Sequence, residues 1–329
     1  MGQLIDGEWH TTGYQQSRHG GRFVRGESAF RNWITSDGRP GPSGEGGFEA
    51  ESGRYHLYVS HACPWAHRTL ILRHLKDLTP HITVDVVHPL MKEDGWTFAT
   101  DFPGATGDSL MGKDFLREVY TTAQPDATGR VTVPVLWDKR RSTIVSNESA
   151  EIIRMLNSAF DHVTGNDTDY YPADRRPEID AVNERVYHAI NNGVYKSGFA
   201  TTQDAYEEAV TELFTALDEM EARLSSGRYL TGGRMTEADW RLFTTLIRFD
   251  PVYVGHFKCN IRRLRDYPNL WNYMLELYQV PGLSGITRLD HIKFHYYASH
   301  EQVNPTGIVP LGPILDLEAP HDRGRMPAV

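Results

Sequence analysis

One of the two cysteines in this chain of 329 residues stands where a nucleophile could be activated. Cys63 lies in the tetrapeptide Cys-Pro-Trp-Ala, between a strand-like alternation and a helix-like spacing of apolar residues. Pro64 suits a first helical turn, because its φ is fixed and it lacks an N–H. Cys63 is therefore expected at the N-cap, where the helix dipole and unpaired backbone N–H groups favour the reactive thiolate. The competing interpretation is an inert, buried cysteine that happens to start a helix.

The tetrapeptide also restricts the chemistry, because Ala66 stands where a dithiol motif would have its second cysteine. Cys259 lies far downstream, and we expect it in a helical region with a structural role. Without a neighbouring thiol, the natural covalent intermediate of Cys63 is a mixed disulfide with a small external thiol. No metal site is expected from His61 and His67, because helix geometry points His67 away from an N-cap residue.

The segments around Cys63 are expected to form a β-α-β unit. Alternating apolar residues predict a strand with one buried face: Tyr55, Leu57 and Val59. The apolar residues that follow Cys63 recur as on one helix face: Ala66, Leu70, Ile71, Leu75 and Leu78. A second alternation over residues 82–86 predicts another strand, parallel to the first because a helix separates the two.

A hairpin is predicted next, from the alternation of Val131, Val133 and Val135 and from a second apolar pair at residues 144–145. Pro134 is anomalous inside a strand and is tolerated at an edge, at a bulge or as a cis bond. If the Val133-Pro134 bond is cis, the Val133 backbone groups are turned outward and can pair with an extended peptide.

Two further features could bind a peptide-like ligand. The helix predicted over residues 150–156 begins after Glu148 and Ser149. Its N–H groups and the Ser149 hydroxyl suit a carboxylate, and Glu148 suits an amine, although simple helix capping explains both residues equally well. Trp96 lies in a long irregular segment, residues 88–124. Its indole N–H could bond to a ligand carboxylate, or its ring could fill the edge of a core.

Composition excludes several classes of function. The net charge of −9 argues against nucleic acid and anionic membrane surfaces as partners. No apolar run approaches the length of a membrane span, and the first ten residues do not read as a secretory signal. Two cysteines imply no disulfide framework, so a reducing, cytoplasmic location is expected.

The chain is expected to combine an α/β domain with an all-α domain. Residues 176–192 and 205–224 have helical periodicity, and Thr236 with Asp239 resembles a capping box. We expect an N-terminal extension that wraps the surface (1–50), an α/β domain (51–160), an all-helical domain (175–310) and a tail (311–329). Phe23, Phe30 and Trp33 could anchor the extension.

The predicted order of elements, with a cysteine at the first helix and a proline before the third strand, resembles the thioredoxin fold as glutathione transferases use it. Longer strings resemble the Xi class of these transferases, the glutathionyl-hydroquinone reductases. The strings are CPWA, DGWTF, SNESAEI, NNGVYKSGFATTQ, RFDPVYVGHFKCN, RDYPNLWNYMLELYQVPG and IKFHYYASHEQVNPTGIVPLGP. The resemblance implies a thioredoxin-like domain that binds glutathione, followed by an all-helical domain.

The resemblance also implies a set of site residues, with Cys63 as the nucleophile. The residues that it implies for glutathione are Trp96, Arg130, Val133, Glu148 and Ser149. The residues that it implies for an aromatic second substrate, bound between the domains, are Tyr195, Tyr253 and Tyr296. An arginine can grip a carboxylate through two hydrogen bonds, and phenol groups can bond to a dihydroxyarene and pass a proton. Without the resemblance, we would interpret Arg130 as a solvent-exposed charge in a turn.

The implied activity is glutathione-dependent reduction of S-glutathionyl-hydroquinones, in a homodimer that needs no metal. Two alternatives remain open. A conjugating or omega-like thiol-transferring transferase is one, although a conjugating enzyme uses a Ser or Tyr hydroxyl where this chain has Cys63. A non-enzymatic thiol-binding module with the same fold is the other.

Overall fold

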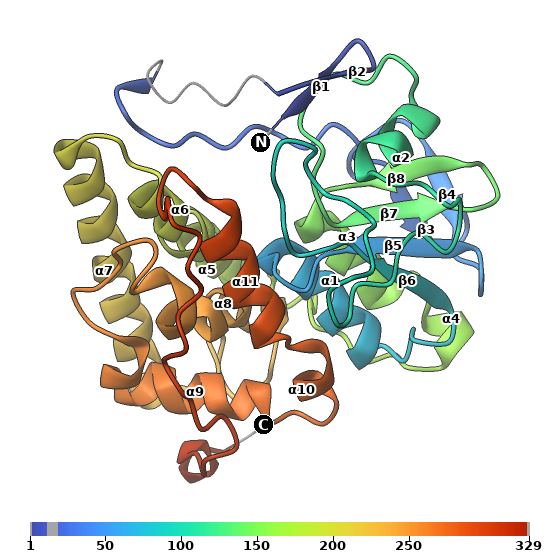
Figure 1. Ribbon diagram of the computed structural model, residues 1–329. Helices are drawn as coiled ribbons and strands as arrows, with labels where there is room; N and C mark the ends of the chain where they lie inside the picture. Colours follow the sequence, from blue (N-terminus) through green and yellow to red (C-terminus); the bar gives the residue numbers. More distant parts are fainter. Residues whose placement is uncertain (1, 12–18, 328–329) are drawn as a thin grey trace. The chain divides into compact units, whose positions relative to one another are not determined.

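The computed structural model describes residues 2–11 and 19–327, which form two compact units. The first unit comprises residues 2–11 and 26–168, and the second comprises residues 19–25 and 169–327. Residues 19–50 are therefore divided between the units, although the sequence reads as one N-terminal extension. Each unit is described by itself below (Figure 1).

Four strands form the sheet of the first unit, in the order β6 (Ile82–Val86), β5 (Tyr55–Val59), β7 (Val135–Asp138) and β8 (Thr143–Ser146). β5 runs parallel to β6 and antiparallel to β7, and β7 and β8 form the expected hairpin (Figure 1). The prediction that β5 has one buried face is wrong, since all five of its residues are buried. The cause is its inner position, where His56 bonds to Thr83 and lies 3.3 Å from the Asp85 carboxylate.

The strand after Pro134 is shorter than the valine alternation suggests. β7 begins at Val135, so Val131 and Val133 precede it, and Pro134 is not inside a strand. The Val133-Pro134 peptide bond is cis, which is one of the three possibilities that the sequence left open.

Two long helices of this unit pack against each other, α1 (Pro64–Leu75) and α3 (Ser149–Ser158). α2 (Leu116–Ala123) contacts β8, and the short α4 (Asp161–Thr164) follows α3. Leu78 is buried but lies beyond α1, because the helix ends at Leu75 and the chain turns at Asp77 with φ +56°.

The N-terminal residues add two small sheets to the first unit. β1 (Gln3–Ile5) and β2 (Glu8–His10) form an antiparallel hairpin, and β3 (Trp33–Thr35) pairs in parallel with β4 (Gly47–Glu49). The hairpin turns at Asp6-Gly7, where both residues have positive φ. A Cβ at Gly7 would stand 2.0 Å from the Pro125 carbonyl oxygen, so only glycine lets the turn approach this loop.

The second unit is helical. Its α-helices are α5 (Arg176–Val186), α6 (Gly193–Gly198), α7 (Gln203–Ser226), α8 (Glu237–Arg248), α9 (Pro268–Tyr278), α10 (Leu283–Ile286) and α11 (Leu289–Ser299). Two π-helical segments interrupt them, η2 (Tyr187–Asn191) and η3 (Phe249–Tyr253). The remaining short helices are η4 (Leu264–Asp266) and η5 (Arg323–Arg325). Among residues 2–11 and 19–327, no helix has the length and apolar character that crossing a bilayer requires.

A buried carboxylate organises the start of α8. Asp239 is fully buried, and its oxygens accept hydrogen bonds from the Thr236 N–H at 2.8 Å, the Leu230 N–H at 2.9 Å and the Tyr273 hydroxyl at 2.7 Å. Thr236 is the N-cap, as the sequence predicts. Burial raises the pKa of Asp239, against the effect of these hydrogen bonds. The carboxylate thus joins the helix start, the preceding loop and α9.

We expect Asp239→Ala to lower the free energy of unfolding by about 3 kcal/mol, because several buried donors lose their acceptor. Urea unfolding measures the change. Asp174→Ala is the matched control, since that side chain is 80 % exposed, and its effect should stay within about 0.5 kcal/mol. Equal effects of the two substitutions would contradict the role assigned to Asp239.

Candidate active site

Cys63 occupies the N-cap of α1, as the sequence predicts. Its backbone is extended, with φ −77° and ψ 121°, and Pro64 is the first helical residue. The Cys63 carbonyl accepts the N–H of His67 at 3.0 Å, which is the first hydrogen bond of the helix. The thiol is partly exposed. A partly exposed sulfur at the positive end of a helix dipole has the environment that activates a thiol.

The backbone of Val133 lies beside this sulfur. Cys63 Sγ is 3.5 Å from the Val133 carbonyl oxygen, close enough for a weak S–H···O hydrogen bond. Within residues 2–11 and 19–327, the Val133 N–H has no acceptor. This N–H can therefore pair with an extended peptide laid next to Cys63. Arg130, three residues earlier, is exposed.

Glu148 and Ser149 form the N-terminus of α3. Glu148 is the N-cap, and its Oε1 accepts the Ala150 N–H at 3.0 Å. Ser149 is buried, and its Oγ lies 3.5 Å from Nη1 of the buried Arg68. Glu148 thus caps its own helix, while each carboxylate oxygen retains capacity for a further hydrogen bond.

The loop that carries Trp96 is held by the N-terminal hairpin. Trp96 is 6 % exposed, and its carbonyl accepts the Leu116 N–H at 3.0 Å. One residue before it, a Cβ on Gly95 would stand 3.0 Å from the Trp9 ring, and Trp9 Nε1 donates to the Glu93 carbonyl at 3.0 Å.

The same hairpin also pairs with the segment before Arg130. Leu4 and Gly129 exchange two backbone hydrogen bonds, each 2.9 Å long. The two loops that carry Trp96 and Arg130 are therefore tied to one element, which sequence patterns did not reveal.

Residues 28–32 contact the start of α3, and sequence reasoning missed this contact. Phe30 and Asn147 are joined by a 3.0 Å backbone bond, and Asn147 Oδ1 accepts the Phe30 N–H. The Ser28 hydroxyl donates to Glu148 Oε2 at 3.0 Å. Arg31 pairs with Ser146 as an isolated bridge beside β8. These partners are more than 100 residues apart in the chain, so no local periodicity could signal them.

The three tyrosines implied by the resemblance meet in the second unit. Tyr195 comes from α6, Tyr253 ends η3, and Tyr296 lies on α11. The Tyr296 hydroxyl lies 2.5 Å from that of Tyr195 and 3.1 Å from that of Tyr253. Tyr253 and Tyr296 are at most 1 % exposed, whereas Tyr195 is partly exposed. The phenols thus form a hydrogen-bonded chain whose accessible end is Tyr195.

Burial makes the two inner phenols harder to ionise. It raises the pKa of Tyr253 and of Tyr296 well above the usual 10, and the charge of the fully buried Arg248 acts in the opposite direction. Both phenols therefore stay neutral even well above pH 7 and can donate hydrogen bonds. π-Helical turns such as η3, which carries Tyr253, are frequent at functional sites.

Buried histidines lie around Tyr296. His256 Nε2 is 3.2 Å from His300 Nδ1, and the His295 ring lies 5.2 Å from the Tyr296 ring. Burial lowers the pKa of His256 to about 4, and the charges of Lys258 and His295 act in the same direction. His256 is thus neutral at physiological pH.

This shift predicts how stability depends on pH. Between about pH 6.5, the usual pKa of histidine, and pH 4, the unfolded chain binds a proton at His256 that the folded chain does not. The free energy of unfolding should therefore fall as pH decreases through this window, with about 3 kcal/mol arising from His256. Urea unfolding of wild type and His256→Gln at pH 7.5, 6 and 4.5 tests this. Parallel decreases in the two proteins would contradict it.

Cys259 differs from Cys63 in its place in the fold and in its exposure. The prediction that it lies in a helical region is wrong, since it lies in the loop after η3, where its N–H bonds to the Tyr253 carbonyl at 2.9 Å. It is fully buried, and burial raises its pKa to about 12. Such a thiol is inert, so the expected structural role fits.

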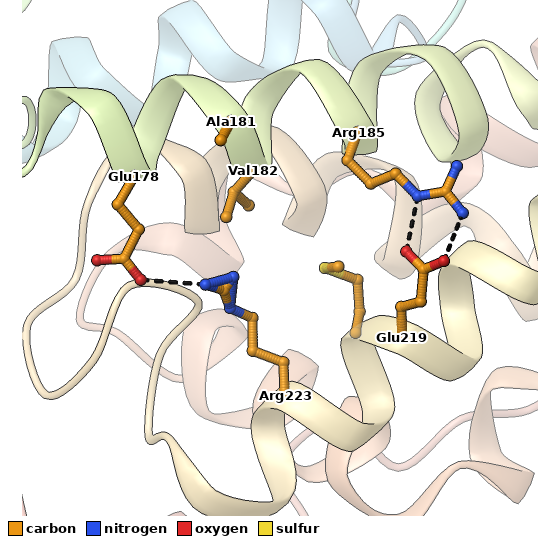
Figure 2. Close-up of a pocket in the computed structure, with 7 residues that line it drawn as sticks. Glu178, Ala181, Val182, Arg185, Glu219 and Arg223 are labelled. Atoms are coloured by element: carbon orange, nitrogen blue, oxygen red, sulfur yellow. Dashed lines mark hydrogen bonds and ion pairs between the residues drawn. The ribbon is translucent and has the colours of Figure 1, made fainter.

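A separate hollow of about 350 Å³ lies between α5 and α7 (Figure 2). Its two guanidinium groups are already paired, Arg185 with Glu219 at 2.7 Å and Arg223 with Glu178 at 3.0 Å. None of the predicted site residues lines it. Within the part of the chain that the structure describes, no group of three or more His, Cys, Asp or Glu side chains could hold a metal ion.

The chain is similar in sequence to known proteins over most of its length. The glutathione S-transferase N-terminal domain model matches residues 62–159, and the C-terminal domain model matches residues 203–276. Glutathionyl-hydroquinone reductase YqjG of Escherichia coli K12 is 58% identical over 98% of each chain. Glutathionyl-hydroquinone reductase PcpF of Sphingobium chlorophenolicum is 54% identical over 96% of this chain and 98% of its own.

Solved structures are similar to this chain over nearly its whole length. The glutathione-bound structure of YqjG superposes with a TM-score of 0.92 at 56% identity, over 98% of this chain and 99% of the other. The Xi-class transferase of Natrialba magadii superposes with a TM-score of 0.90 at 47% identity, over 99% and 98%.

The fold is thus that of a glutathione transferase, with a thioredoxin-like domain followed by a helical domain, which confirms the predicted fold class. Within that fold, the chain belongs to the Xi class, the family of the glutathionyl-hydroquinone reductases. The resemblance drawn from the sequence strings is therefore confirmed.

Proposed function

We propose that this protein reduces S-glutathionyl-hydroquinones to hydroquinones, with glutathione as co-substrate. The observation that carries the proposal is a partly exposed thiol at a helix N-terminus, whose only companion cysteine in the sequence is buried. A close relative has a glutathione-bound structure, and two relatives bear the name of this activity. A thiol with these surroundings exchanges with an external thiol rather than closing an internal disulfide.

Glutathione lies, in this proposal, along the backbone of Val133, with its sulfur at Cys63. Arg130 and Trp96 bind one of its carboxylates, and the N-terminus of α3 binds the γ-glutamyl end through Glu148 and Ser149. The Val133 N–H, which has no acceptor among the described residues, supports this placement. So does the position of Ser149 in the first turn of α3.

The reaction starts with the substrate in its keto form, in which the carbon that bears sulfur carries a hydrogen next to a carbonyl. The Cys63 thiolate attacks the glutathione sulfur, the C–S bond breaks, and its electron pair forms the enolate of the hydroquinone. Tyr195 transfers the proton, while Tyr253 and Tyr296 hydrogen-bond the developing negative charge. A glutathione thiolate then attacks the glutathionyl sulfur of the mixed disulfide, and the Cys63 thiolate leaves as oxidised glutathione forms. One glutathione thiol and the glutathionyl sulfur of the conjugate are thus oxidised to the disulfide as the arene is reduced.

Mass spectrometry tests the central intermediate. After incubation with oxidised glutathione, the protein should carry one glutathionyl group, on Cys63, and none on the buried Cys259. Unmodified Cys63 would refute the proposal. Comparing chlorodinitrobenzene conjugation with glutathionyl-menadiol reduction separates the conjugating alternative, since the proposed enzyme should favour reduction.

The proposal includes a homodimer in the cytoplasm. It also retains the domain limits 1–50, 51–160, 175–310 and 311–329. Sedimentation equilibrium measures the oligomeric state directly.

A further inference from the structure

A short piece of the N-terminal extension packs on the accessible tyrosine of the phenol chain. The Phe23 ring is stacked 6.2 Å from the Tyr195 ring, with an interplanar angle of 28°. The Arg25 guanidinium lies over the same Tyr195 ring, 5.1 Å from its centroid. Phe23 also packs against Phe199, one turn further along the chain, at 5.6 Å. Tyr195 is therefore contacted by an aromatic ring and a cation from the same short segment.

This segment is fastened to the helical unit on both sides of Phe23. The Gly21 carbonyl accepts the Thr201 N–H at 3.1 Å, and the exposed Arg22 pairs with Glu208 at 2.7 Å. After Phe23, Arg25 Nε donates to the buried Asn192 Oδ1 at 2.8 Å.

The Arg25–Asn192 bond directs the guanidinium over the ring rather than into solvent. The positive charge of Arg25 is thus held over the Tyr195 ring.

A cation above a phenol ring acts differently on the two protonation states. It is attracted to the negative face of the neutral ring, and more strongly to the full negative charge of the ionised ring. The cation therefore favours the state in which the Tyr195 oxygen has given up its proton. The Tyr296 hydroxyl lies 2.5 Å from the same oxygen and can donate a hydrogen bond to it once it is ionised, which reinforces this preference.

We propose that Arg25, held by Asn192 and backed by Phe23, is a positioning residue that assists proton transfer by Tyr195. The inference rests on the proposed function, in which Tyr195 moves the proton during C–S cleavage. It assigns to the N-terminal extension a part in the chemistry, beyond wrapping the surface.

Steady-state kinetics with glutathionyl-menadiol tests the inference. Arg25→Gln should lower kcat about tenfold and change KM less than about twofold, because the cation acts on the proton-transfer step. Arg25→Lys, which keeps the charge, should restore kcat to within about threefold of wild type. Arg22→Gln is the matched control, since Arg22 pairs with Glu208 at the surface, and it should leave kcat unchanged.

Combining substitutions identifies the group through which Arg25 acts. In a Tyr195→Phe background, Arg25→Gln should cause no further loss of kcat. Each of three results would overturn the inference. They are a further tenfold loss of kcat in the Tyr195→Phe background, an unchanged kcat in Arg25→Gln alone, and no recovery of kcat in Arg25→Lys. If the wild-type protein does not reduce the substrate, the proposed function and this inference both fail. If the wild type is active and Arg25→Gln has the same kcat, this inference alone fails.

Discussion

Replacing Cys63 by alanine is expected to lower the turnover of glutathionyl-menadiol by at least about a thousandfold. The reason is that the sulfur of Cys63 forms and breaks the mixed disulfide, and no other group at the N-terminus of α1 can replace it. Cys63→Ser should be equally inactive, because a serine hydroxyl does not accept a glutathionyl group from sulfur. The measurement is the initial rate of hydroquinone release.

Cys259→Ala is the control for this substitution. It removes the only other thiol, which is buried and whose pKa is raised to about 12, so activity should stay within about twofold of wild type. Cys63 is partly exposed and precedes the helix, so Cys63→Ala should unfold at nearly the wild-type temperature. Turnover by folded Cys63→Ala would refute the mixed-disulfide mechanism.

Replacing Tyr195 by phenylalanine is expected to reduce kcat about a hundredfold, the typical contribution of a positioned proton donor. Tyr195 is the accessible end of the phenol chain, and its partners Tyr296 and Tyr253 are buried and neutral. The variant keeps the ring and its contacts with Phe23, so the loss reports the hydroxyl alone. Formation of the Cys63 mixed disulfide with oxidised glutathione should be unaffected, since that exchange needs no proton from Tyr195.

Tyr206→Phe is the matched control for this effect. The Tyr206 hydroxyl, on α7, donates to the Lys258 carbonyl at 2.7 Å, outside the phenol chain. Its loss should leave kcat unchanged. Equal kcat values for Tyr195→Phe and wild type would remove the proton-transfer role from Tyr195.

The parts of the site that follow from local chemistry could be predicted from sequence. The position of Cys63 follows from Pro64 and from the change of apolar spacing, and both act over a few residues. The helix start at Thr236 and Asp239 is equally local. The three tyrosines are different, because only family resemblance singles them out among sixteen. Their hydrogen bonds join residues up to 101 positions apart, and no spacing rule connects them.

What the sequence could not reveal depends on distant contacts. β5 reads as a half-buried strand, because the burial of His56 depends on Asp85 and Thr83 in a neighbouring strand. Likewise, the contact of Ser28 with Glu148 and that of Arg25 with Tyr195 come from a segment that is rich in glycine and arginine and has no periodicity. Composition predicts a loop there but does not predict what the loop covers.

The contact of residues 30–32 with β8 has a consequence for solubility. β8 is the outer strand of its sheet, and the Asn32 N–H bonds to the Val145 carbonyl at 3.0 Å, with Arg31 bridged to Ser146. An outer strand without such a neighbour offers unpaired backbone groups to other molecules, and this is a common route to aggregation. Residues 30–32 thus protect the outer edge of this sheet. A variant that begins after residue 32 would expose unpaired backbone groups of β8 to other protein molecules.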